Sequence, residues 1–249
     1  MSAPAMDWTP GRRKSAALHV HLLGLAEQRS VVHLQDELAQ EIAERDDTYG
    51  TLLICEHPFG ISVGREAHAE DLRVDRDDFD RRGISVNWTP RGGRVWVHHP
   101  GQLACYFLAP ITRLGITAED WCRRLAAAAA DTAHELGVAI EEPSAIPGAS
   151  ARCGQFAFVG AAIRNGVSLF GSCLNVSVPR DVLQMANWGP GVRPSTISAE
   201  RMRPTAMAAV REGWVRQLAA HTGYDRMHLT TGHLRLKRTE QPGYVFAET

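Results

Sequence analysis

The strongest constraint on the fold is a pair of strand-like runs separated by one Asn-Gly dipeptide. Residues 156–163 and 167–176 are rich in apolar and small side chains, and Asn165-Gly166 stands between them. Asn and Gly tolerate the positive φ angles of a type I′ turn, whose twist matches that of two antiparallel strands. The sequence therefore predicts a β-hairpin over 156–176.

Further strands and helices follow from the hydrophobic period along the chain. Periods typical of strands and of amphipathic helices alternate. Strands are expected at 17–25, 51–55, 61–63 and 84–87, and helices at 31–43, 117–136 and 205–220. The alanine-rich helix expected at 117–136 has Thr117 at its start as an N-cap and Gly137 at its end. The charged stretch 66–82 is expected to lie on the surface. This mixture favours an α/β (α+β) fold, a mixed β-sheet with packed helices.

Composition and charge exclude several classes of protein. The 249 residues carry 27 Lys and Arg against 28 Asp and Glu, a net charge of -1 that offers no broad attraction to nucleic acid or to an anionic membrane. No apolar stretch is long enough to span a bilayer and no signal sequence is visible, so a cytoplasmic protein is expected. The five cysteines form no close pairs. His19 and His21 are spaced to share a strand face, but no cysteine or carboxylate stands directly beside them, so no metal is predicted, and no cofactor is predicted either.

We expect three segments: a flexible N-terminus at 1–13, one domain at 14–224, and a C-terminal tail at 225–249. The first contains Pro4, Pro10 and Gly11, which are typical of a loose terminus.

One motif combines features of a binding loop. Arg91-Gly92-Gly93 precedes a short apolar run that ends at His98, and Pro100-Gly101-Gln102 follows. Two glycines let the backbone approach a ligand closely, while the guanidinium and free N–H groups offer donors.

This string resembles the signature of the lipoate-pathway octanoyltransferases, the octanoyl-[acyl carrier protein]:protein transferases. Three further segments agree with that family in order and spacing. They are Leu52–Pro58 with Val63-Gly64-Arg65, Val159-Gly160, and Gly171–Val176, within a match that runs from about Ala17 to Gly223.

The resemblance implies the fold of the biotin/lipoate protein ligases, with a groove for a medium-chain acyl group. In the family, a cysteine thiolate takes octanoate from acyl carrier protein and passes it to a lysine of a lipoyl domain. Such domains occur in 2-oxoacid dehydrogenases and in the glycine cleavage H protein. A thiolate is both a good nucleophile and a good leaving group, so one acyl transfer becomes two easier ones.

Two positions depart from the family pattern. Gln155 stands where the resemblance places the family's lysine, and no lysine lies between Lys14 and Lys237. Trp188 stands where it places the cysteine, and no cysteine follows Cys173. The two-step route is therefore not available in the family's form, and the active site is expected to be degenerate.

Candidate catalytic residues are His98, Cys153 and Gln155. An unperturbed histidine pKa of about 6.5 suits a general base. Cys153 precedes Gln155 by two residues, so in a strand the two side chains would share one face about 7 Å apart. Cys173 is a weaker thiol candidate, and Cys55, Cys105 and Cys122 are assigned to the core. The resemblance assigns substrate binding to Arg91, Gly92, Gly93, Gly101, Gln102, Gly160, Gly171, Asn175 and Trp188, around a groove lined by Arg91–His98 and Gly160.

Three functions are consistent with this reading. The first is an octanoyltransferase-like protein that binds a medium-chain acyl group and transfers it by a modified mechanism. The second is a catalytically inactive homologue that binds an acyl group or a carrier protein. The third, an ATP-dependent ligase, is weaker because the ligases also use a lysine near the adenylate and no Walker-type loop is present.

Overall fold

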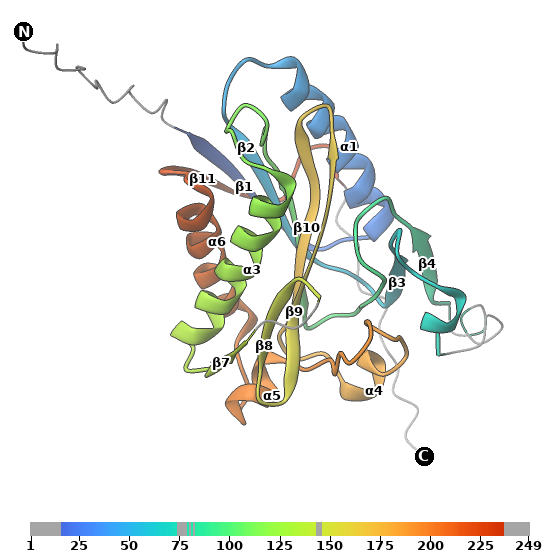
Figure 1. Ribbon diagram of the computed structural model, residues 1–249. Coiled ribbons are helices and arrows are strands. Elements are labelled where there is room, and N and C mark those ends of the chain that lie inside the picture. Colours follow the sequence, from blue (N-terminus) through green and yellow to red (C-terminus); the bar gives the residue numbers. More distant parts are fainter. Residues whose placement is uncertain (1–15, 74–78, 80, 82, 143–145, 237–249) are drawn as a thin grey trace, which may run out of the picture.

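Two sheets organise the protein. The computed structural model describes residues 16–73, 79, 81, 83–142 and 146–236. Eight strands form a mixed sheet in the order β11-β1-β2-β6-β10-β9-β8-β7, and three form a small sheet in the order β4-β3-β5 (Figure 1). β1 pairs in parallel with β2 and β11, and the other neighbours in the large sheet are antiparallel. The predicted mixed sheet is confirmed.

The bounds of the elements are as follows. The large sheet contains β1 (Ala17–Leu25), β2 (Gly50–Glu56), β6 (Gln102–Leu108), β7 (Ile140–Glu141), β8 (Gly148–Ala151), β9 (Gly154–Arg164), β10 (Val167–Asn175) and β11 (Arg226–Thr231). The small sheet contains β3 (Gly60–Val63), β4 (Ser85–Trp88) and β5 (Val95–His98). The helices are α1 (Gln28–Glu44), η1 (Ala69–Asp71), α3 (Ala118–Glu135), α4 (Arg180–Leu183), α5 (Ile197–Arg201) and α6 (Met207–Thr222).

The predicted hairpin at 156–176 and the predicted alanine-rich helix are both present, each with the local residues that favour it. β9 and β10 pair from Arg164 opposite Val167, and Asn165 and Gly166 have φ angles of 51° and 77° between them. The Thr117 side chain accepts a hydrogen bond from the backbone N–H of Asp120 at the start of α3. Both predictions are confirmed, and α1 and α6 match the other two predicted helices to within three residues.

The helices α3 and α6 cover one face of the large sheet, and α1 and the small sheet cover the other face (Figure 1). α3 and α6 bury Trp121 and Trp214 against Phe107 of β6 and its neighbours. On the opposite face, α1 packs over β6 and β10, and the small sheet packs against Phe158 and Cys173. Both faces of the central strands are therefore covered, and every residue of β10 is buried.

The small sheet was not expected. The predicted strands 61–63 and 84–87 exist as β3 and β4, but they pair with each other and with β5, outside the large sheet. One prediction about the intervening charged segment is wrong: Asp71 is buried and pairs with Arg94 at 2.8 Å. A buried carboxylate needs such a partner.

The predicted C-terminal tail contains a strand of the sheet. β11 lies within 225–249 and pairs with β1 over six residues, from Ala17 opposite Arg226 to Leu22 opposite Thr231. All six residues of β11 are exposed, so no buried apolar period marked it. The predicted flexible segment 1–13 and residues 237–249 lie outside the described residues. Within the described chain, no helix is both long and apolar enough to cross a membrane.

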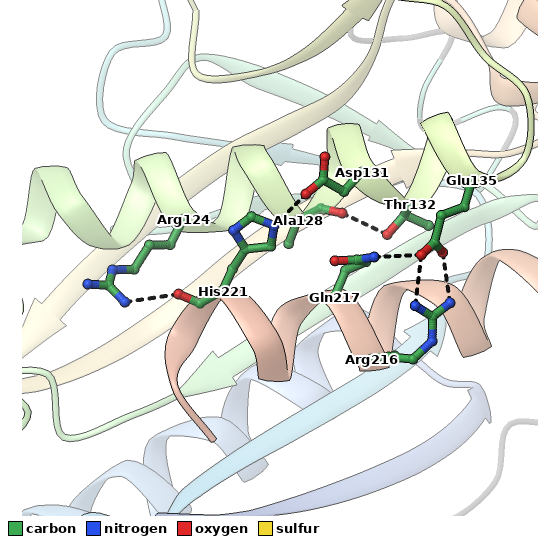
Figure 2. A network of polar contacts seen from close by, with 8 residues as sticks. All are labelled: Arg124, Ala128, Asp131, Thr132, Glu135, Arg216, Gln217 and His221. Atoms are coloured by element: carbon green, nitrogen blue, oxygen red, sulfur yellow. Dashed lines mark hydrogen bonds and ion pairs between the residues drawn. The ribbon is translucent and has the colours of Figure 1, made fainter. Parts of the chain in front are cut away.

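Polar contacts line the outer side of the α3–α6 pair (Figure 2). Glu135 accepts two hydrogen bonds from the Arg216 guanidinium, at 2.8 and 2.7 Å, and Asp131 lies 2.7 Å from His221. The Arg216 guanidinium lowers the pKa of Glu135 to about 2. These groups are exposed, and surface ion pairs contribute little to stability. The buried tryptophans beneath them should dominate the docking of α6.

We expect Trp214→Ala to lower the free energy of unfolding by about 3–5 kcal/mol, because it leaves a cavity in the main core. Glu135→Gln should leave the urea midpoint at neutral pH nearly unchanged. Any stabilisation from the Glu135 carboxylate is complete above its unfolded pKa of 4.5 and is lost as the pH falls toward about 2. Urea unfolding of both variants tests this, and a larger loss in Glu135→Gln would contradict it.

Candidate functional site

Buried polar side chains meet where the small sheet contacts the large one. The His98 ring, at the end of β5, has Nδ1 2.8 Å from Gln102 Oε1 and Nε2 2.8 Å from Ser62 Oγ and 3.0 Å from Gln28 Nε2. Gln102 Nε2 donates to Asn175 Oδ1 at 2.8 Å. Three of the predicted site residues, His98, Gln102 and Asn175, are therefore brought together.

The tautomer of His98 follows from its partners. Gln102 Oε1 can only accept, so Nδ1 carries the hydrogen and Nε2 accepts from Gln28 and Ser62. Burial holds the pKa of His98 well below its ordinary value, and nearby His57 and Arg91 lower it further. A neutral imidazole with both nitrogens bonded inside the protein suits a structural role. These surroundings do not favour the predicted general base, which would have to reach an incoming amine.

Arg91 is directed into the protein. Its guanidinium lies 3.8 Å from the centroid of the Trp96 ring and donates to the carbonyl and hydroxyl oxygens of Ser62 at 2.8 and 2.9 Å. Burial lowers its pKa to about 9, so it keeps its charge at neutral pH. Among the described residues it has no ion-pair partner, and stacking on Trp96 takes that place. Arg91 therefore does not present its guanidinium to a ligand from outside.

The predicted groove between Arg91 and His98 is filled. The space that these two side chains share with Trp96 and Cys173 is about 10 Å³, room for no more than one water. Arg91 and Trp96 themselves occupy it. Of the segment Arg91–His98, the side chains of Arg91, Trp96 and His98 therefore leave no room for an acyl chain on this side of the loop.

A larger cavity lies on the other side of the loop that contains Gly92 and Gly93, which we call the glycine loop. Its volume is about 710 Å³, within the range of small-molecule sites. It runs along β9 between Gly92-Gly93 and α3, and we call it the α3 groove. Small or apolar residues line most of it: Gly92, Gly93, Ala118, Cys122, Ala126, Ala127, Ala130, Ile140, Ile146, Pro147, Gly148, Ala149, Val159, Gly160 and Ala161. Arg65, Glu66, Glu119, Arg123 and Glu141 complete the lining.

Backbone contacts explain the glycines of this groove. The N–H of Gly92 donates to Ala161 O at 3.0 Å and so attaches the loop to β9. A Cβ on Gly160 would lie 2.6 Å from Gly92 O and 2.9 Å from the Trp96 ring. Three residues assigned to substrate binding, Gly92, Gly93 and Gly160, therefore line the α3 groove, with glycine at 160 because the chains touch there.

Gly101 and Gly171 serve packing instead. Gly101 has a φ of 97°, its N–H donates to Glu56 Oε2 at 2.8 Å, and its carbonyl accepts from the backbone of Val176 and Ser177. Gly171, on β10, lines the filled 10 Å³ space. Neither glycine contacts the α3 groove.

Cys153 and Gln155 do not share a strand face. Cys153 lies in the turn between β8 and β9 and lines a separate cavity of about 310 Å³, together with Arg180 and Arg193. Gly154, with a φ of 140°, changes the chain direction after it. Gln155 is buried and donates to Ala157 O at 3.0 Å. The predicted pair is therefore separated by the turn, and the amide of Gln155 is engaged with backbone.

Trp188 is part of the core. Its ring lies 4.3 Å from that of Phe158, its Nε1 donates to Leu183 O at 2.7 Å, and 2% of it is exposed. The position at which the resemblance places the family's nucleophile is thus occupied by a buried indole. Its assignment to substrate binding does not fit this geometry.

The sequence alone does not identify Cys122 and the alanines of α3 as residues that line the groove. Cys122, which the sequence assigns to the core, packs against the main core and is half-buried; it also lines the α3 groove, where burial raises the pKa of its thiol. The alanine run predicts a helix with small side chains. The sequence does not show which face of that helix lies against β9, because this depends on how the helix packs on the sheet.

We expect Gly160→Ala to destabilise the protein by about 1–3 kcal/mol, because the added Cβ would overlap the Gly92 carbonyl. Gly213→Ala is the matched control in α6, where the nearest atom to a new Cβ is 3.4 Å away. That change should stabilise by up to about 1 kcal/mol through helix propensity. Equal urea midpoints for the two variants would show that the glycine loop is not in contact with β9.

Comparison with known proteins agrees with this fold. The family profile described as lipoyl protein ligase A/B catalytic domain matches residues 29–212. An octanoyltransferase of Pseudomonas putida strain F1 is 29% identical over 219 residues, which cover 88% of this chain and 98% of that protein.

Two solved structures share the fold. A crystal structure of lipoate-protein ligase A bound with ATP superposes with a TM-score of 0.71 at 16% identity, over 87% of this chain and 90% of that one. The bipartite lipoate protein ligase of Thermoplasma acidophilum, described with its E2 lipoyl domain, has a TM-score of 0.67 at 17% identity, over 88% and 89% of the chains. Because the family profile covers more than half of its residues, the chain belongs to the lipoyl protein ligase A/B catalytic domain family.

Proposed function

We propose that this protein acts in protein lipoylation by binding a medium-chain acyl group in the α3 groove and transferring it from acyl carrier protein to a lipoyl-domain lysine. The observation that carries the proposal is the 710 Å³ groove, lined by small apolar side chains next to the Gly92-Gly93 loop. The relative in Pseudomonas putida is named octanoyltransferase, and a structural neighbour was described with its E2 lipoyl domain.

Burial of the acyl chain supplies the binding energy in this proposal. Each buried methylene contributes about 0.8 kcal/mol, so an octanoyl chain gains roughly 5 kcal/mol in an apolar groove. Ala126 and Ala130, one helical turn apart on α3, leave room for an extended chain along β9. The groove thus suits a linear alkyl group better than a bulky ring.

The proposed route has one step. The lipoyl-domain lysine amine attacks the thioester carbonyl, forming the amide bond as the carbon–sulfur bond to the carrier breaks. The carrier's thiolate leaves and takes the proton that the amine gives up. Holding donor and acceptor together supplies the rate enhancement through effective concentration. This route needs neither a thiol at Trp188 nor a cation at Gln155.

A second candidate is a non-catalytic homologue that binds the acyl group without transferring it. The observation in its favour is that Trp188 and Gln155 are both held in core contacts. A relocated nucleophile is the remaining variant of the first candidate, since Cys153 is partly exposed in a cavity with two arginines.

The proposal predicts the products of one incubation. When the protein is mixed with octanoyl-acyl carrier protein and an apo lipoyl domain, intact mass spectrometry should show one octanoyl group on the lipoyl domain. A stable octanoyl adduct on this protein that disappears in Cys153→Ser would support the relocated nucleophile. Acyl binding without any transfer would favour the second candidate, and absence of binding would contradict both.

Filling the α3 groove should weaken acyl binding. We expect Ala126→Leu to raise the Kd for octanoyl-pantetheine by about tenfold or more, because the larger side chain competes with the acyl chain for space. Ala209→Leu, on the exposed side of α6, is the control and should leave the Kd unchanged. Hexanoyl-pantetheine should bind wild type about 15-fold more weakly than the octanoyl ester, from the loss of two methylenes. Isothermal titration calorimetry measures all three.

A further inference from the structure

Two charged residues, Arg65 and Glu66, lie at the end of the α3 groove that the glycine loop forms. Their backbone N–H groups donate to Arg91 O and Gly93 O at 3.1 and 3.2 Å, which attaches them to the loop. An ideal Cβ on Gly92 would lie 3.6 Å from Glu66 Oε1 and 3.9 Å from Arg65 Nη2, so both head groups lie beside Gly92. All three of these residues line the groove.

The wall that α3 contributes to the groove becomes apolar along the helix, and its last three lining residues are alanines. The Cys122 thiol interacts with the backbone of Ala161, to which the Gly92 N–H also donates, so Cys122 lies at the end near the glycine loop. Ala130 is eight residues farther on, about 12 Å along the helix axis. The charged lining residue from β7, Glu141, is an anion and does not attract a carbonyl oxygen. An acyl chain therefore fits with its carbonyl at the glycine loop and its methyl end toward Ala130.

Arg65 is the cation that this end of the groove offers to a ligand. Arg123 also lines the groove, but its guanidinium forms an ion pair with Asp120. Arg91 lines the filled space on the other side of the loop. Arg65 is exposed, and within the described residues its guanidinium has no hydrogen-bond or ion-pair partner. A free guanidinium beside an acyl groove can donate to a carbonyl oxygen.

We propose that this charged end of the α3 groove receives the reacting groups: Arg65 donates to the carbonyl oxygen of the acyl thioester, and Glu66 accepts from the amine of the incoming lysine. This inference rests on the proposed function. Arg65 thereby supplies a cation, which the chain lacks at Gln155.

The bonds made and broken are those of the proposed route. As the lysine nitrogen bonds to the carbonyl carbon, the carbonyl oxygen gains negative charge next to the Arg65 guanidinium. The C=O double bond forms again when the carbon–sulfur bond breaks, and the thiolate leaves with the proton from the nitrogen. A cation beside the developing oxyanion stabilises the transition state more than the ground state. The Glu66 carboxylate attracts the lysine and orients its amine.

Arg65→Gln in the full chain should separate catalysis from binding. We expect kcat for octanoyl transfer to an apo lipoyl domain to fall about 10- to 100-fold, less than at a buried oxyanion site because water screens an exposed charge. The Kd for octanoyl-pantetheine should change by less than about twofold, because burial of the acyl chain supplies the binding. Arg65→Lys keeps the cation and should recover most of the rate. Arg164→Gln, at the exposed end of β9 outside the groove lining, is the control and should transfer like wild type.

Glu66→Gln should affect the acceptor instead. We expect the KM for the lipoyl domain to rise about tenfold and the Kd for octanoyl-pantetheine to stay unchanged. Added salt should raise the KM of wild type more than that of the variant, because it screens the attraction between Glu66 and the lysine. Glu212→Gln, on the exposed side of α6, is the matched control and should keep the wild-type KM and its salt dependence.

The failure of this inference differs from the failure of the proposed function. If wild type transfers octanoate and both variants transfer it equally well, Arg65 and Glu66 do not receive the reacting groups, and the proposed function stands. If Arg65→Gln weakens octanoyl-pantetheine binding as much as it slows transfer, the residue only shapes the groove and the inference is wrong. If wild type transfers nothing, the proposed transfer fails and this inference fails with it.

Discussion

A continuous set of buried hydrogen bonds holds the two sheets of this protein together. It runs from Arg91 through Ser62 and His98 to Gln102 and Asn175, and so from the glycine loop to the centre of the large sheet. Buried polar groups are costly unless they are paired, so these partners specify one way of seating the small sheet. The position of the glycine loop, and with it the α3 groove, depends on this seating.

Within the motif Arg91–His98, neighbouring residues have different roles, because only some of them take part in these buried hydrogen bonds. Arg91 and His98 face inward and complete the junction, while Gly92 and Gly93 face the groove. The motif therefore joins a structural half and a ligand-facing half within a few residues. The residues that the resemblance groups into one binding site therefore lie on two sides of the glycine loop in this structure.

Two positions to which the resemblance assigns the family's reactive groups hold other side chains in this chain, Gln155 and Trp188. The scaffold superposes on lipoate ligases, but a buried indole and a backbone-bonded amide occupy the positions that the resemblance gives to thiol and ammonium. Fold alone does not carry function, which depends on the groups that reach the ligand. What this scaffold retains is a shaped apolar groove, and binding and positioning are what such a groove can supply.

Local physical chemistry let the sequence determine much of this protein. The turn at Asn165-Gly166, the cap at Thr117 and the mixed sheet with its helices all followed from residue preferences and hydrophobic period. Other features depend on partners distant in the chain, such as the second sheet, the pairing of the exposed strand β11 with β1, and the inward turn of Arg91 onto Trp96. A hydrophobic period reports which side chains are buried but not what buries them. Tertiary structure alone therefore decided that the cavity lies against α3, because only the packed chain shows which spaces the side chains have already filled.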